Sequence, residues 1–305
     1  MKPTMISAAK FQIRSYIELM KLRIGFLIAL SAMAGYAAVS THVNGWQLAV
    51  LFLAMLLGSS GSAVFNQYYD RDIDRLMPRT AKRPLAAQTL GNPVRALWFA
   101  GALLLTGCAL ATLAFNWVVA VHLFLGAFVY GIVYTVWLKR RHWTNIIIGG
   151  AAGSFAVLGG AAAVDPSLWL LPALMAITLF LWTPAHFWSL AILIKDGYVK
   201  AGVPMLPVVV GDAATANWIL GNTILLVGSA LLPVALGQLG WLYAIISSIF
   251  GARFLWLNWQ LVKDPSLVWA RRNFLFSMQY LAGVFLAVVV DKHVPFDAIR
   301  KALGL

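Results

Sequence analysis

Three of the chain's ten acidic residues lie within five positions of one another, in the stretch FNQYYDRDIDRLMPRTAKRP at positions 65–84. Asn66, Asp70 and Asp74 recur every four residues. A helix would therefore align them on one face over about 12 Å and turn Asp72 roughly the opposite way. Amide and carboxylate oxygens are ligands that Mg²⁺ prefers, together with water and phosphate oxygens. This stripe of Asn66, Asp70 and Asp74 on one helix face predicts a site for Mg²⁺ and a diphosphate.

Basic side chains follow this stripe directly. Arg79, Lys82 and Arg83 lie just downstream, and such cations hold phosphate oxygens through charge-assisted, often bidentate hydrogen bonds. The alternative is a solvated loop beside a membrane, in which Arg and Asp pair and the cations fix the topology. Acidic residues contribute little to topology, and here they keep helical register with an asparagine. Both facts favour the metal site.

A second polar stretch, KDGYVKAGVPMLPVV at positions 195–209, carries Asp196, Tyr198 and Lys200. Asp196 would supply a further metal ligand that faces the first stripe, and Lys200 would neutralise a diphosphate. An ordinary polar turn explains the same spacing equally well.

The elements that position these residues are membrane-spanning helices. The chain is 61% hydrophobic and 11% charged with a mean hydropathy of +0.82, whereas soluble domains carry about 25% charged residues. Runs of about 20 apolar residues cross a bilayer as helices. We predict an all-α, polytopic membrane helix bundle of about nine transmembrane helices. The predicted spans are 24–43, 46–66, 94–115, 118–138, 145–164, 168–194, 214–236, 239–259 and 273–291.

The connections between the spans alternate in charge. Those near positions 44, 116, 166 and 237 contain no Lys or Arg, and most of the basic residues lie in the other connections. We expect one integral membrane domain, 1–305. By the positive-inside rule, its N-terminal segment 1–23 and its loops 67–93 and 195–213 would be cytoplasmic, and its tail 292–305 external. The net charge of +13 is then a topology signal, and we expect no nucleic-acid partner.

Several stretches resemble the UbiA superfamily of intramembrane prenyltransferases. The matching pieces are NQYYDRDID, RTAKRPL at 79–85 and VYTVWLKRRHWTNIIIG at 133–149. Within that superfamily, LWTPAHFWSLAI at 181–192 and YVKAGVPMLPVV at 198–209 are most similar to the branch of protoheme IX farnesyltransferases, the heme O synthases. The resemblance covers almost the whole chain and implies a UbiA-type fold with its active site at the cytoplasmic end.

The resemblance implies an enzyme, a transferase of prenyl groups. Its reaction would be the Mg²⁺-dependent transfer of a farnesyl group from farnesyl diphosphate to the 2-vinyl group of heme B. It also implies the bacterial cytoplasmic (inner) membrane as location, with the lipid bilayer around the chain. The resemblance further implies contact with heme A synthase or oxidase assembly proteins. Asn66, Asp70 and Asp74 would hold Mg²⁺ and diphosphate. The side chains that would stabilise the diphosphate as it leaves are Arg79, Lys82, Arg83, Lys139 and Arg140.

One departure from the family pattern concerns the second loop. The family acid usually stands directly before the tyrosine, but here Gly197 precedes Tyr198 and Asp196 lies one residue earlier. If Asp196 is to serve as a metal ligand, the backbone must adjust locally, which a glycine permits.

The expected substrate contacts are aromatic residues and a histidine. Aromatic faces stabilise an allylic cation, and Tyr68, Tyr134 and Tyr198 lie near the expected end of the bundle. His186, beside Trp182 in span 168–194, is an intramembrane ionisable residue and so a functional candidate. It would ligate the heme iron or form a hydrogen bond with a heme propionate. A structural histidine bonded between helices is the alternative.

Two rival functions remain open. Prenylation of an aromatic acceptor in quinone synthesis shares the Mg²⁺–diphosphate half, and only TPAHFW at 183–188 and the segment 201–209 favour heme. A secondary transporter would place charged residues near the middle of the bilayer, but the predicted spans contain almost none.

Overall fold

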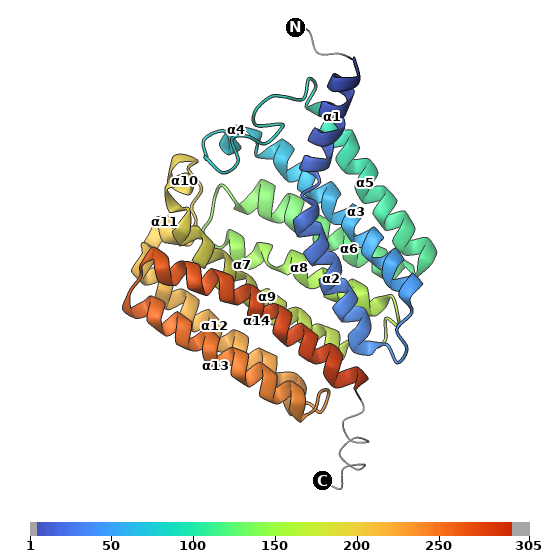
Figure 1. Cartoon of the computed structure of the whole chain (residues 1–305), viewed down its shortest axis with the longest axis vertical. Helices are drawn as coiled ribbons and strands as arrows, with labels where there is room; N and C mark the ends of the chain where they lie inside the picture. The colour runs from blue at the N-terminus through green and yellow to red at the C-terminus, as the bar shows by residue number, and fades with distance from the viewer. Residues whose placement is uncertain (1–4, 295–305) are drawn as a thin grey trace.

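The computed structural model describes residues 5–294, and over this range the chain contains helices and turns but no strand (Figure 1). The predicted all-α fold is confirmed. Most of the predicted external tail 292–305 lies outside the described residues. The helices are α1 (Met5–Leu19), α2 (Leu22–Val39), α3 (Gly45–Tyr69), α4 (Arg71–Asp74), α5 (Val94–Ala114), α6 (Trp117–Phe128), η1 (Val129–Leu138), α7 (Asn145–Gly149), α8 (Ala151–Ala162), α9 (Leu170–Leu193), α10 (Lys195–Lys200), α11 (Leu206–Val210), α12 (Asp212–Ala235), α13 (Trp241–Lys263) and α14 (Leu267–His293).

Eight helical segments within residues 5–294 are long and apolar enough to cross a membrane. They are α2, α3, α5, α6 with η1, α7 with α8, α9, α12 and α14. The ninth predicted span, 239–259, corresponds to α13, which is not one of these eight. Asn258, Gln260 and Arg253 interrupt its apolar sequence.

The geometry of α13 shows that it runs the length of the bundle. At its first residues, the Asp291 carboxylate near the end of α14 accepts hydrogen bonds from the backbone N–H groups of Gly240 (2.7 Å) and Tyr243 (3.2 Å). At its other end only residues 264–266 separate it from the start of α14. The two helices therefore form a full-length antiparallel pair (Figure 1).

Small residues let α2 and α8 approach closely. A Cβ on Gly160 would lie 1.8 Å from the carbonyl oxygen of Ala32, and one on Gly35 would lie 2.1 Å from that of Val157. Only glycine fits at such distances, and small residues are typical of contacts between helices in membranes. This crossing joins α2 to the helix that follows η1 and α7.

Buried hydrogen bonds join α12, α13 and α14. The Asn258 side chain accepts from the Thr223 hydroxyl (3.0 Å) and donates to Oδ1 of Asn273 (3.0 Å), and all three residues are fully buried. A polar group in an apolar bundle is costly unless it is paired. The three groups satisfy one another and fix these helices in register.

The two predicted active-site loops lie at the same end of the bundle. Loop 67–93 contains α4, and loop 195–213 contains α10 and α11 (Figure 1). The loops touch, because a Cβ on Gly197 would lie 3.3 Å from the side chain of Met77. Helix α1, which we did not predict, lies at this end too.

Candidate active site

Asp70 is at the centre of the candidate site. Its carboxylate is fully buried, and Oδ2 accepts hydrogen bonds from Nδ2 of Asn66 (2.7 Å) and from the ammonium of Lys139. The other oxygen, Oδ1, accepts no hydrogen bond from the described residues. Nη2 of Arg140 lies at an ion-pair distance of 3.5 Å from Oδ1.

The backbone explains why Asn66, Asp70 and Asp74 follow one another. Helix α3 ends at Tyr69, and Asp70 joins it to the short helix α4. The backbone N–H of Asp70 still donates to the carbonyl of Asn66 (2.9 Å), and that of Asp74 donates to the carbonyl of Asp70 (2.8 Å). The helical spacing therefore continues through the junction.

Asp72 faces a different environment from its neighbours. Its side chain is 61% exposed, and both carboxylate oxygens accept from the guanidinium of Arg140 at 2.7 Å. These hydrogen bonds from Arg140 hold the pKa of Asp72 below its usual value. Arg140 also donates to the Tyr69 carbonyl (2.9 Å) and lies over the Tyr69 ring. Through these contacts, Arg140 joins the turn after η1 to the end of α3 and to Asp72.

Asp74 is the second buried carboxylate. It is 2% exposed, and its Oδ2 accepts from Nη1 of Arg83 at 2.7 Å. The Thr80 hydroxyl donates to the backbone carbonyl of Asp74 (2.8 Å), which folds the loop back and brings Arg83 to the carboxylate. Of the three basic residues predicted in this loop, Arg83 is therefore the one next to an acid.

Lys21 belongs to the site and was missing from the sequence-based prediction. It lies between α1 and α2 with a left-handed backbone (φ 48°), and its ammonium donates to Oδ1 of Asn66 at 2.8 Å. Burial, followed by repulsion from Arg83 and Lys139, lowers the pKa of Lys21 well below its ordinary value. In the sequence this lysine resembles the other basic residues before the first span, so it reads as a topology signal.

The π-helical segment η1 positions Lys139. A π-helix bonds each N–H to the carbonyl five residues earlier, as the Lys139 N–H does with Tyr134 (2.8 Å). Inside this segment the buried Thr135 hydroxyl donates to the Tyr130 carbonyl (2.8 Å) and accepts from Nδ2 of Asn66 (3.1 Å). Thr135 therefore orients the asparagine, a role that its residue type does not reveal.

The predicted aromatic residues fall into two environments. Tyr134 stacks on Tyr130 with ring centroids 5.7 Å apart, and the Lys139 ammonium lies 5.9 Å from the Tyr134 ring centre. Tyr198 is buried, which raises the pKa of its hydroxyl. Tyr68 instead packs beside Leu19 on another face of α3, under the guanidinium of Arg71. Tyr134 lies beside Lys139, and Tyr198 lies within electrostatic reach of Lys139 and Arg83, so both belong with the site, whereas Tyr68 does not.

The remaining predicted polar residues lie at the surface. Arg79, Lys82 and Lys200 are exposed and form no ion pair with another described residue. Asp196 is also exposed, and with Arg79 it lines a cleft of about 370 Å³ between loop 67–93 and α10. The structure does not bring Asp196 together with Asp70 and Asp74.

The donor set fits Mg²⁺ bound together with a ligand that supplies further oxygens. Asn66, Asp70 and Asp74 offer only oxygen ligands, and Oδ1 of Asp70 is buried without a hydrogen bond. Within residues 5–294 no three His, Cys, Asp or Glu side chains gather to form a metal site of protein ligands alone. Mg²⁺ commonly takes one or two carboxylates and completes its shell with water and phosphate oxygens.

His186 lies deeper in the bundle, between α9 and α14. Its ring is sandwiched between Trp182 (4.3 Å between centroids) and Phe274 (4.8 Å). Its Nδ1 is 2.7 Å from the Ser277 hydroxyl, and Nε1 of Trp182 donates to the Ser277 carbonyl at 2.7 Å. Both faces of the imidazole are covered, so a ligand would reach the ring only at its Nε2 edge.

Comparison with known proteins agrees with this geometry. Residues 28–282 match the UbiA prenyltransferase family. Protoheme IX farnesyltransferase 1 of Paramagnetospirillum magneticum is 60% identical over 280 residues, which cover 92% of this chain and 99% of that protein. Protoheme IX farnesyltransferase 2 of the same organism is 48% identical over 275 residues, which cover 89% of this chain and 94% of that protein.

Two solved structures share the fold at low sequence identity. A digeranylgeranylglyceryl phosphate synthase superposes with a TM-score of 0.76 at 21% identity, over 92% of this chain and 98% of that one. A UbiA homologue from Archaeoglobus fulgidus, bound to DMAPP and Mg²⁺, superposes with a TM-score of 0.68 at 17% identity, over 90% and 99%. Motifs, fold and relatives agree: the chain belongs to the UbiA prenyltransferase family.

Proposed function

We propose that this protein is a heme O synthase, which transfers the farnesyl group of farnesyl diphosphate to the 2-vinyl group of heme B. The observation that carries the proposal is the buried group of Asn66, Asp70 and Asp74 among more cations than acids, at one end of an apolar bundle. The relatives named protoheme IX farnesyltransferase support heme as acceptor.

The donor half of the reaction needs a binding site for diphosphate. Asn66, Asp70 and Asp74 would hold Mg²⁺, which neutralises diphosphate charge and polarises the bond to the farnesyl carbon. The UbiA homologue bound to DMAPP and Mg²⁺ supports this choice of metal. The chain itself would supply cations to the phosphate oxygens.

The half-buried cations suit a leaving group that gains negative charge. Four cationic side chains contact the Asn66–Asp70–Asp74 group, which carries two carboxylates: Lys21, Lys139, Arg83 and Arg140. Each cation can turn from its present partner to a phosphate oxygen. Fixed charges in a site away from water stabilise such an anion strongly. Arg79, Lys82 and Lys200, exposed at the same end, would meet the outer phosphate.

The proposed reaction couples loss of diphosphate from the donor to addition across the 2-vinyl group. The bond between the allylic farnesyl carbon and the diphosphate oxygen breaks, and its electron pair leaves with diphosphate. The farnesyl carbon bonds to the terminal vinyl carbon of heme B. Water then adds a hydroxyl to the vinyl carbon next to the porphyrin and releases a proton. The rings of Tyr134 and Tyr198 would stabilise the allylic cation, and the bundle would keep other water away.

The acceptor half involves the aromatic residues inside the bundle. We propose that His186 presents its Nε2 edge to heme B and that Trp182 fixes the imidazole by stacking on it. Ser277 sets the orientation of the ring through Nδ1. Asp196 stays a predicted metal ligand, one that would need loop 195–213 to move toward Asp74.

We also propose the bacterial inner membrane as location, with the site end of the bundle in the cytoplasm. The basic residues of the loops support this orientation through the positive-inside rule. Contact with heme A synthase or oxidase assembly proteins stays a prediction.

One experiment separates this function from prenylation of an aromatic acceptor. Membranes that contain the protein are given labelled farnesyl diphosphate with heme B or with 4-hydroxybenzoate, at ordinary Mg²⁺. We expect label in a hydroxyethylfarnesyl heme and none in the benzoate. Label in the benzoate alone would overturn the proposed acceptor and leave the donor site in place.

A further inference from the structure

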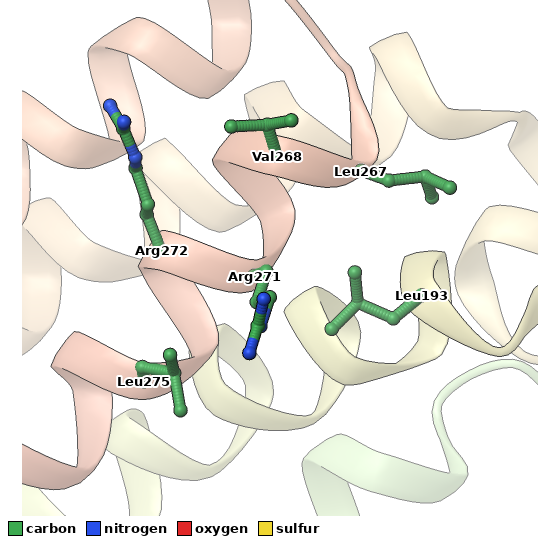
Figure 2. A pocket seen from close by; sticks show the side chains of 6 residues that line it. All are labelled: Leu193, Leu267, Val268, Arg271, Arg272 and Leu275. Atoms are coloured by element: carbon green, nitrogen blue, oxygen red, sulfur yellow. The ribbon is translucent and has the colours of Figure 1, made fainter.

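A groove lies between the last turn of α9 and the first turns of α14 (Figure 2). Its volume is about 480 Å³. Four aliphatic side chains and two arginines line it: Leu193, Leu267, Val268, Leu275, Arg271 and Arg272. The groove is therefore apolar except for its guanidinium groups.

The two arginines are not equivalent. Figure 2 shows the Arg271 guanidinium pointing into the space between α14 and α9, whereas Arg272 extends away from it. Arg272 lies over the Trp269 ring at 4.5 Å. Arg271 is exposed and forms no ion pair with another residue of the described chain. A guanidinium beside an apolar wall is complementary to a carboxylate attached to an apolar body.

The groove adjoins both parts of the candidate site. Leu193 and Leu267 also line the cleft that contains Arg79 and Asp196. The same helix α14 also carries Phe274, next to Leu275 in sequence, and the Phe274 ring stacks on His186. A ligand in the groove would therefore lie beside the exposed cations of the donor side, against the helix that also packs on the histidine proposed for the acceptor.

We propose that this groove binds the acceptor, with Arg271 paired to a propionate carboxylate of heme B and the porphyrin against Leu193, Leu267 and Leu275. The inference rests on the proposed function, because that function identifies the acceptor as heme. Among carboxylate ligands, heme fits the groove through its charge and through its apolar ring. Arg271 is then a specificity-determining residue for the acceptor and plays no part in binding farnesyl diphosphate.

The test compares Arg271→Gln with the control Arg253→Gln, using purified protein in phosphatidylcholine nanodiscs. Arg253 is also an exposed arginine, but it lies over the Phe276 ring and does not line the groove. We expect Arg271→Gln to raise the KM for heme B about tenfold, the loss of one charge-assisted pair. Its KM for farnesyl diphosphate should stay unchanged, and Arg253→Gln should behave as wild type. Equal effects of both variants, or a parallel rise in both KM values, would overturn the proposal.

A second comparison uses heme B dimethyl ester, whose propionates carry no charge. If Arg271 pairs with a propionate, wild type should lose affinity for the ester and Arg271→Gln should show no further loss. If Arg271→Gln raises the KM for the ester as much as it raises the KM for heme B, the pairing with a propionate is contradicted. An effect that appears only when anionic lipid is added would assign the groove to a lipid and overturn the proposal.

Equilibrium binding of heme, followed by tryptophan quenching, separates this inference from the proposed function. If Arg271→Gln binds heme more weakly than wild type but wild type farnesylates no heme, the proposed function is overturned and the heme-binding groove is supported. If wild type farnesylates heme and Arg271→Gln binds heme equally well, the heme-binding groove is overturned and the proposed function is supported.

Discussion

The ammonium of Lys21 donates to Oδ1 of Asn66 at 2.8 Å, although 45 positions separate the two residues in sequence. The amide oxygen that the sequence assigns to a metal is thus already bonded to a cation from the start of α2. A metal ion at Asn66 would compete with this ammonium, which would then be free to contact a phosphate oxygen. A metal ion bound at Asn66 would therefore be coupled to Lys21 through one amide.

The first prediction concerns the buried carboxylates. Asp70→Asn and Asp74→Asn should each lower farnesyl transfer by about 100-fold or more, because each removes a proposed metal ligand together with the partner of a half-buried cation. The measurement is the initial rate of product formation across a range of Mg²⁺ concentrations.

Asp72→Asn is the matched control for these variants. Asp72 is exposed and pairs only with Arg140 among the described side chains, so we expect a rate within about threefold of wild type, since exposed ion pairs contribute little. Equal losses in all three variants would show that the loop needs its charge as a whole and would remove the special role of the buried pair.

The second prediction concerns Thr135. Thr135→Val should lower kcat/KM about tenfold at ordinary Mg²⁺, because Asn66 loses the hydroxyl that orients its amide, and groups that orient metal ligands commonly contribute this much. Excess Mg²⁺ should recover part of the loss. Thr135→Ser keeps the hydroxyl and should retain most of the activity. A similar loss in the serine variant would indicate a packing role instead.

The third prediction is a pH dependence. Burial lowers the pKa of Lys21 below its ordinary value of 10.5, and only the protonated amine attracts diphosphate. The affinity for farnesyl diphosphate should therefore fall as the pH rises through this lowered pKa, at a pH below 10.5. Lys21→Arg, which stays charged throughout, should flatten the profile. An identical profile in that variant would assign the titration to another group.

The fourth prediction concerns stability. Gly160→Ala should destabilise the protein by about 1–3 kcal/mol, because its Cβ would overlap the Ala32 carbonyl and force α2 and α8 apart. Gly221→Ala, in α12, is the control, since apart from its chain neighbours and the backbone of its own helix no atom lies within 4 Å of its added Cβ. Thermal unfolding in detergent measures both. A melting temperature for Gly160→Ala equal to that of the control would contradict the close crossing.

The long helices could be predicted because apolar runs of bilayer length leave few other structures. Their ends could not. We placed the last span at 273–291, but α14 begins at Leu267, because Arg271 and Arg272 end the apolar run without ending the helix. Likewise the predicted span 145–164 consists of α7 and α8, which join at Gly150.

The candidate site was predictable where residue type and spacing both carry information. Asn66, Asp70 and Asp74 are scarce residues in regular order. Lys21 and Thr135 lack such a signal, because lysine is common beside a membrane span and threonine is common inside one. Their contacts depend on the left-handed backbone at Lys21 and on a π-helical segment, and neither is encoded by a simple periodic pattern.

The π-helical segment η1 makes the site depend on how tightly the chain is wound as well as on its composition. An α-helix advances each residue by about 100° around its axis, and a π-helix, whose hydrogen bonds span five residues, advances each residue by less. If the stretch Val129–Leu138 took ordinary α-helical bonding at its present length, everything that follows would rotate about the helix axis. Lys139 would then turn away from Asp70. A substitution that favours α-helical bonding in this stretch would therefore disturb the site without changing any residue that lines it.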